Sequence, residues 1–303
     1  FKFFESQESL FSALKLRQID GFGSLLPLTE LPKISNNQIE IIPMPRYYAI
    51  FLNPNINPAL KKLDLRRALA FAIDKSRINQ EIFGGDAQIL NVPLFQTEPT
   101  ESQITSFNPD EARKLIDALK TKKEKLEFTL IVPNIDFLKK TAELIKDSWL
   151  SVGIEKINIL TLNNDDLSTN AIKTRNYEML LFGNVLETPL DLFSFWHSSQ
   201  RFYPGLNLAL YQNQKADAAM EAIRQTEDTN QQKILLNTVL GFISNDAPAI
   251  FLFSLPYTYI HSNNLTGFEF SNHDKFLITP ANRFESVQKW ATSKARIIKE
   301  SVQ

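Results

Sequence analysis

The alternation of hydrophobic and polar positions predicts a strand, a turn and two short helices in the first part of the chain. Residues 48–52 form an apolar run of strand length, and residues 53–58 form a turn rich in asparagine and proline. The apolar residues that follow recur at helical spacing: Leu65, Ala68, Leu69, Ala72 and Ile73. We expect Asp64 to cap this helix, Asp74 to cap the next one, and Gly84 to end it.

Strand and helix patterns alternate through the middle of the chain. Strands are predicted at 126–132, 154–162, 177–183 and 249–255, and helices at 109–119, 137–152, 216–224 and 231–244. Asn108 precedes the first of these helices as a cap, and Asp165 or Asp166 can cap another that runs to about Thr174. Strand 177–183 is apolar at nearly every position, as buried parallel strands tend to be. This order favours βαβ units and an α/β sheet.

The two ends of the chain carry weaker patterns. Phe1, Phe3 and Phe4 are typical of the end of a strand, and a helix with Leu10, Phe11 and Leu14 follows them. Residues 22–46 contain several prolines and predict a linker that includes a strand near Ile39. The tail, 291–303, has helical composition.

Composition narrows the class of protein. The length of 303 residues allows one large domain or two of ordinary size, and 43% hydrophobic with 22% charged residues is typical of a globular chain. A net charge of −1 gives no electrostatic reason to expect nucleic acid. The absence of cysteine excludes disulfides and thiolate zinc sites.

No catalytic constellation is recognisable. The three histidines lack the short spacing of metal ligands, and there is no nucleophile elbow and no Walker loop. We therefore predict no enzyme, no cofactor and no metal site. An enzyme on an α/β scaffold is kept as one alternative, which a screen for hydrolase activity would test.

One segment resembles a family signature. In the family-5 extracellular solute-binding proteins, the peptide-binding components of bacterial ABC importers, a strand ending in Asn leads through a proline turn to the pattern R-x-A-L-x-x-A-I-D. The matching residues here are Asn53, Pro58, Asp64, Arg67, Ala68, Leu69, Ala72, Ile73 and Asp74. Shorter resemblances cover Ala13–Gly21, Asp246–Phe251, Gly267-Phe268 and the last strand region of the family at Phe284–Trp290.

The resemblance implies a two-lobed α/β fold of the type II periplasmic-binding-protein class, with lobe one incomplete. Residues 1–46 would be part of lobe one and the crossover, 47–257 lobe two, and 258–303 the return to lobe one with a tail. The chain would correspond to roughly the C-terminal three-fifths of a full-length member.

The resemblance also implies a ligand site in the segment after strand 177–183, where the carboxyl end of a strand is reached. Asn184 takes the place of a pocket Trp, and Glu187 that of an Asp which faces the α-ammonium group of a peptide. Glu187 can pair with a cation, but it is one methylene longer, and it can equally be a loop carboxylate. The further candidates for ligand contact are Phe182, Phe253, Tyr257 and Asn207, whereas Trp149 and Trp196 are assigned to the core.

The function implied is capture of a peptide, or a related small ligand, by hinge closure and its delivery to a membrane ABC permease. Such a protein would be an extracytoplasmic monomer, and a lipid anchor or cleaved signal would precede Phe1. The altered segment around Asn184 and Glu187 favours a second alternative: a degenerate member that acts in surface adhesion or as a scaffold without transporting a ligand.

Overall fold

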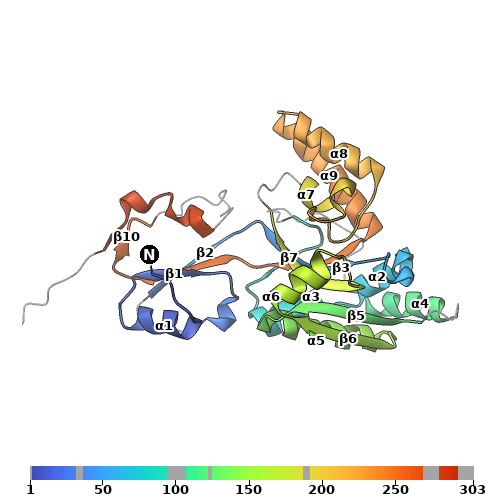
Figure 1. Cartoon of the computed structure of the whole chain (residues 1–303), viewed down its shortest axis with the longest axis horizontal. Helices are drawn as coiled ribbons and strands as arrows, with labels where there is room; N and C mark the ends of the chain where they lie inside the picture. Colours follow the sequence, from blue (N-terminus) through green and yellow to red (C-terminus); the bar gives the residue numbers. More distant parts are fainter. Residues whose placement is uncertain are drawn as a thin grey trace, which may run out of the picture. The chain divides into compact units, whose positions relative to one another are not determined.

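The computed structural model describes residues 2–31, 37–94, 107–121, 125–186, 192–268 and 280–292 (Figure 1). The chain divides into two compact units. Unit 1 comprises Phe1–Met44 with Leu255–Gln303, and unit 2 comprises Pro45–Ser254. The lobe limits expected at residues 46 and 257 lie near these divisions, and the assignment of the units to lobes one and two stays a prediction.

Unit 2 is built on a mixed six-stranded sheet with the order β4-β8-β3-β7-β5-β6. The strands are β3 (Arg46–Leu52), β4 (Gln88–Ile89), β5 (Glu127–Pro133), β6 (Lys156–Leu162), β7 (Met179–Val185) and β8 (Ala249–Ser254). β5 is parallel to β6 and β7, whereas β3 is antiparallel to both β7 and β8. The strands β5, β6, β7 and β8 therefore all end at one edge of the sheet, where β3 begins. We call this the carboxyl edge.

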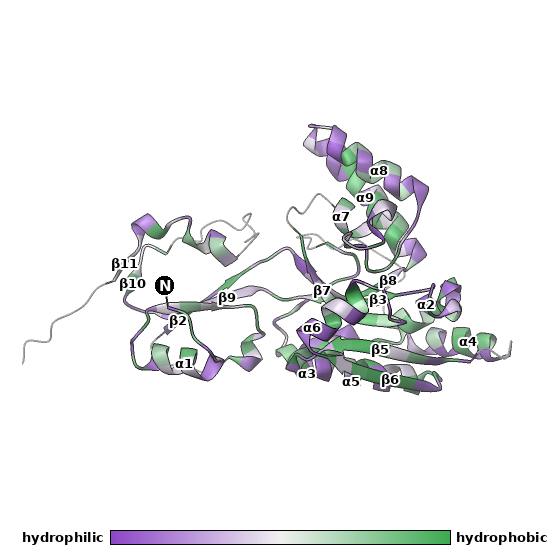
Figure 2. Ribbon diagram, in the orientation of Figure 1, coloured by the Kyte–Doolittle hydropathy of each residue, from purple (hydrophilic) through white to green (hydrophobic). Residues whose placement is uncertain are grey.

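Helices cover both faces of this sheet. They are α2 (Leu63–Phe71), α3 (Lys75–Phe83), α4 (Pro109–Lys120), α5 (Asp136–Ser151), α6 (Asn164–Asp166), α7 (Phe193–Trp196), α8 (Gln214–Gln225) and α9 (Thr229–Asp246). α8 and α9 pack side by side, as do α2 and α4. Figure 2 shows β5 strongly apolar and α8 and α9 mixed in colour, as expected for a buried strand and amphipathic helices.

Both tryptophans assigned to the core are fully buried, which confirms that prediction. Trp149 on α5 also donates from Nε1 to the carbonyl of Leu69 on α2, at 2.9 Å. Trp196 packs against Phe51 and Phe251, which project from β3 and β8. Trp149 thus joins α5 to α2, and Trp196 joins α7 to the sheet.

The signature segment folds as expected except at one cap. The Asp74 carboxylate accepts from the backbone N–H of Arg77 at 2.9 Å, and Gly84 ends α3 with φ of 65°. The prediction that Asp64 caps α2 is wrong. A 3-10 turn at Pro58–Lys61 runs directly into α2, so the helix begins at Leu63 and Asp64 lies inside its first turn without capping it.

Other local predictions also need correction. Asn163, rather than Asp165 or Asp166, caps the helix after β6, because its Oδ1 accepts from the N–H of Asp166 at 2.9 Å. Phe3 and Phe4 lie outside any strand. The region around Phe284 forms 3-10 turns at Pro280–Phe284 and Val287–Lys289 instead of a strand. Phe1 and the tail from residue 293 lie outside the described residues.

Unit 1 holds a smaller antiparallel sheet with the order β1-β9-β2. The strands of this sheet are β1 (Gly21–Ser24), β2 (Asn37–Ile42) and β9 (Tyr257–Ser262). Unit 1 also contains α1 (Gln7–Lys15) and a separate antiparallel pair of β10 (Leu265–Thr266) and β11 (Ala291–Thr292). One cluster joins Leu14 of α1 to Phe22 and Ile260. A second cluster joins Tyr257, Tyr259, Leu265 and their neighbours. Each cluster is small, so unit 1 has a modest core.

The two acidic residues of the signature give a first prediction. Asp74→Ala removes the side-chain acceptor at the N-terminus of α3 and should lower the free energy of unfolding by about 1 kcal/mol. Asp64→Ala is the matched control and should cost clearly less, since Asp64 caps nothing. Urea unfolding of both variants measures the difference, and equal losses would contradict the cap assignment.

Lys75 gives a second prediction. Its Nζ is buried and donates to the Leu90 carbonyl and Asn91 Oδ1, both at 2.9 Å, and burial lowers the pKa of Lys75 from 10.5 to about 7. Between these values the unfolded chain binds a proton that the folded chain does not, so stability should rise with pH, by up to about 1.4 kcal/mol per pH unit.

Lys75→Met should remove this rise between pH 7 and 10. Lys114→Met, at a side chain that is 75% exposed, is the control and should keep it. The measurement is urea unfolding of both variants and the parent protein across this pH range. Parallel curves for the parent and Lys75→Met would contradict the prediction.

Candidate ligand-binding site

The carboxyl edge of unit 2 collects polar residues from four strands. Arg46 begins β3, Asn184 lies near the end of β7, Ser254 ends β8, and Gln88 of β4 pairs with Ser254. In α/β sheets, ligands bind outside the carboxyl ends of the strands, because side chains from several strands and their loops converge there. This edge is therefore the candidate site.

Strand register divides the predicted contact residues between two faces of the sheet. Tyr47 lies opposite Asn184, Tyr48 opposite Gly183, and Ala49 opposite Phe182. Because successive side chains of a strand point to opposite faces, Asn184 and Phe182 share the face of Tyr47. Phe253 instead pairs with Tyr48 on the other face. Sequence spacing alone does not reveal this division.

On the Tyr47 face, the side chains of Asn184 and Tyr47 are joined by a hydrogen bond. Asn184 Nδ2 donates to the hydroxyl of Tyr47 at 2.9 Å, and both side chains are buried. Burial raises the pKa of the Tyr47 hydroxyl, and the hydrogen bond from Asn184 opposes that rise. The Tyr47 ring meets Phe251 edge-on at 5.7 Å. The protein therefore orients the Asn184 amide.

On the opposite face, four aromatic rings form a cluster under the edge. Tyr48 lies 5.2 Å from Phe253 and 5.5 Å from Phe137, and Phe83 lies 4.5 Å from Phe253, all between ring centroids. Gly183 makes room for this arrangement, since a Cβ there would lie 2.7 Å from the Tyr48 ring. Phe253 is 2% exposed and so belongs to the aromatic packing.

Arg46 is the residue at this edge that sequence reasoning missed. Its guanidinium lies 5.9 Å from the centre of the Tyr48 ring and is 4% exposed. Burial lowers the pKa of Arg46 and raises the pKa of Tyr48, whose rise the arginine opposes. An arginine placed directly before an apolar strand is the signal that could have identified it. It brings a positive charge and planar donors to the edge.

Asn207 is fully buried, and its amide is used within the protein. Nδ2 donates to the carbonyls of Trp196, His197 and Tyr211 at 2.9–3.3 Å, and Oδ1 accepts from the N–H of Tyr211 at 3.0 Å. The side chain thus holds the turns between α7 and α8, and it leaves no exposed group for a ligand.

Two further candidates lie elsewhere. Tyr257 is 2% exposed on β9 of unit 1, where its ring lies over Gly23. Glu187 lies outside the described residues. Of the six predicted contacts, the structure brings together Asn184 and Phe182, and it places Phe253 on the other side of the same sheet.

The described residues contain no cluster of three or more His, Asp or Glu side chains that could hold a metal ion. Within the same residues, no helix has the length and apolar character needed to cross a membrane.

Comparison with known proteins identifies a matching family. The model of the bacterial extracellular solute-binding proteins, family 5 (middle region), matches residues 1–202. The curated oligopeptide-binding protein AppA of Bacillus subtilis is 23% identical over 256 residues, which are 78% of this chain and 45% of AppA. The chain thus spans less than half the length of this relative.

Solved structures share the fold. AppA of Bacillus subtilis in complex with a nonapeptide superposes with a TM-score of 0.76 at 20% identity, over 95% of this chain and 58% of AppA. CtaP of Listeria monocytogenes gives 0.81 at 20% identity, over 97% and 60%. NikZ of Campylobacter jejuni in complex with Ni(L-His) gives 0.76 at 21% identity, over 96% and 61%.

These likenesses confirm the expected α/β fold over part of the neighbours' length, and the relatives are solute-binding proteins, not enzymes. Since the family model covers residues 1–202 of 303, this protein belongs to the bacterial extracellular solute-binding proteins of family 5.

Proposed function

We propose that this protein captures a peptide, or a related small ligand, outside the cytoplasm and delivers it to a membrane ABC permease. The observation that carries the proposal is the family match over residues 1–202, because that match includes the strands β3 and β7 that form the middle of the carboxyl edge. The chain spans only part of its relatives, so ligand, permease and hinge closure all belong to the proposal.

The chemistry of the carboxyl edge supports a polar ligand of peptide type. Asn184 brings an oriented amide on one face of the sheet, and Arg46 brings a positive charge beside the Tyr48 ring on the other face. Peptide main chains present the same donors and acceptors whatever their sequence, so a few oriented polar groups can serve many peptides. We assign the α-ammonium contact to Glu187 and a wall of the pocket to the half-buried ring of Phe182.

The proposal extends to location and assembly, and the family description supports the location. The members of the family are described as bacterial extracellular proteins. We propose that this protein works as a monomer at the outer face of the cytoplasmic membrane or in the periplasm, held there by a lipid anchor or released after cleavage of a signal. The nonapeptide in complex with AppA and the Ni(L-His) in complex with NikZ define the ligand classes to test first.

A third prediction concerns the ligand itself. Native mass spectrometry of the gently purified protein, in the longest form that its host makes, should show added mass, and acid release should yield peptides. A bare protein that also binds nothing from a peptide mixture would contradict peptide capture. Binding of a metal chelate instead would keep the transport role with another ligand. Binding of neither would favour the adhesion or scaffold alternative.

A fourth prediction concerns Glu187. Glu187→Gln should weaken binding of peptides with a free N-terminus about 10- to 100-fold, because a hydrogen bond to a charged group contributes about 1.5–3 kcal/mol. N-acetylated peptides should lose far less. Asp191→Asn removes a neighbouring carboxylate in the same segment and is the matched control. Calorimetric titration measures all combinations, and equal losses for both peptide types would contradict the assignment.

A further inference from the structure

A loop of unit 2 exposes three large apolar side chains that lie close together in the sequence. Phe202 is 62% exposed, Tyr203 is 60% exposed and Leu206 is 45% exposed. We call residues 201–206 the aromatic loop. Single exposed apolar residues are common on protein surfaces, whereas a group of them on one loop indicates a surface that contacts another molecule.

A buried arginine holds the aromatic loop in place. Arg175 is 5% exposed, and its guanidinium donates to the carbonyls of Arg201 at 2.9 Å and Gly205 at 2.6 Å. Within the loop, the N–H of Gly205 donates to the carbonyl of Phe202 at 2.8 Å. The backbone of the loop is therefore fixed by hydrogen bonds, while its apolar side chains remain exposed to solvent.

The aromatic loop lies at the edge of the unit 2 sheet opposite the carboxyl edge. Arg175, which holds the loop, lies shortly before the start of β7 at Met179. Its carbonyl accepts from Nδ2 of Asn53, which follows the end of β3, at 2.8 Å. β7 begins and β3 ends at this opposite edge. A molecule that contacts the aromatic loop therefore leaves the candidate ligand site uncovered.

Each of the two exposed rings has a cation beside it. The guanidinium of Arg201 lies 5.7 Å from the centre of the Phe202 ring. Nζ of Lys173 lies 5.7 Å from the centre of the Tyr203 ring. Positive charge and exposed aromatic surface therefore occur together on the aromatic loop and on the segment that precedes β7.

The two segments that meet here have an excess of positive charge. Residues 167–177 and 197–216 contain four Lys or Arg residues and no Asp or Glu. Acidic residues flank these segments at Asp166, Glu178 and Asp217, and each of them accepts a hydrogen bond within unit 2. The surface around the aromatic loop is therefore complementary to a negatively charged partner.

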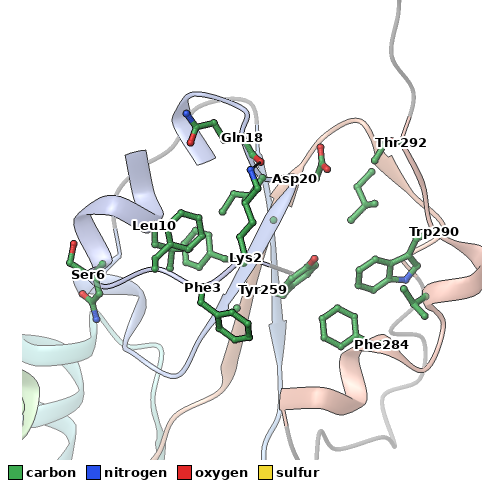
Figure 3. A pocket seen from close by; sticks show the side chains of 18 of the residues that line it. Lys2, Phe3, Ser6, Leu10, Gln18, Asp20, Tyr259, Phe284, Trp290 and Thr292 are labelled. Atoms are coloured by element: carbon green, nitrogen blue, oxygen red, sulfur yellow. Dashed lines mark hydrogen bonds between the residues drawn. The ribbon is translucent and has the colours of Figure 1, made fainter. Parts of the chain in front are cut away.

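Unit 1 also exposes an aromatic residue, but its charge environment is different. Phe3 is 96% exposed and lies beside a hollow of about 910 Å³ that Trp290 also lines (Figure 3). Lys2, Glu5 and Asp20 line the same hollow, so its charges are of both signs. Exposed aromatic surface is thus common to both places, and the excess of positive charge distinguishes the aromatic loop.

We propose that the aromatic loop is a contact site for an anionic lipid surface. Phe202, Tyr203 and Leu206 enter the headgroup region, and Lys173 and Arg201 pair with lipid phosphates. Lysine is depleted from protein interfaces, whereas Lys and Arg beside aromatic and leucine side chains are typical of segments that lie in the membrane interface. The inference goes beyond the proposed function, and its test does not involve the ligand of unit 2.

Flotation of the 303-residue chain with lipid vesicles tests the proposal. The protein should float with phosphatidylglycerol vesicles at low ionic strength and remain unbound with phosphatidylcholine vesicles, whose surface has no net charge. Raising the salt concentration to about 1 M should weaken binding, because the Debye length then falls to about 3 Å.

Two variants test the apolar and the charged part of the site. Phe202→Ser should weaken binding to phosphatidylglycerol vesicles about tenfold, because the ring no longer transfers out of water. Lys173→Gln should weaken it about fivefold, the contribution of one cation near an anionic surface. The matched controls are Phe3→Ser, at the exposed ring of unit 1, and Lys114→Gln, at a lysine that is 75% exposed on α4. Both controls should bind as the parent protein does.

Several outcomes would overturn the proposal. They are no flotation of the parent protein with phosphatidylglycerol vesicles, equal flotation with both kinds of vesicle, and losses in the control variants as large as those in Phe202→Ser and Lys173→Gln. Self-association that Phe202→Ser abolishes, in the absence of flotation, would also overturn it and would assign the aromatic loop to a second copy of the chain.

Discussion

Unit 2 depends on the pairing of β3 with strands on both of its sides. β3 is antiparallel to β7 and to β8, which are far apart in sequence, and its residues from Ala49 to Leu52 are almost completely buried. This central position commits each side chain of β3 to one of two faces. Tyr47 and Phe51 pack toward Trp196 and the helices around it, whereas Tyr48 packs toward Phe83 and Phe137. The apolar core on each face of the sheet therefore contains side chains of β3.

The same pairing builds the candidate site. Because β3 runs against its neighbours, its first residue meets the ends of β7 and β8, and Arg46 lies with Asn184 at one edge. The hydrogen bond between Asn184 and Tyr47 and the packing of Tyr48 over Gly183 then hold polar groups in place from beneath. A site supported in this way is oriented before a ligand arrives, which lowers the entropy cost of binding.

The strands of unit 1 are less completely paired and packed than those of unit 2. The sheet of unit 1 is three strands wide, its apolar clusters are small, and β1 contains two glycines whose places are taken by tyrosines of β9. In unit 2, the strand that carries most of the packing is paired on both sides. In unit 1, the strand at the edge is paired on one side among the described residues. The two units therefore differ in how fully their strands are paired.

Local sequence determined most of the elements. Apolar periodicity placed the helices and strands of unit 2 to within a few residues, and Asp74 and Gly84 marked the ends of α3, because capping and left-handed backbone depend on nearby atoms. The family signature likewise lies in one continuous segment.

Tertiary structure decided the rest. The direction of β3, the face on which Asn184 and Phe253 lie, the buried role of Asn207 and the placement of Arg46 all depend on pairing and packing between distant segments. Those contacts leave no period in the sequence, because strand register and packing partners are chosen only when the sheet assembles.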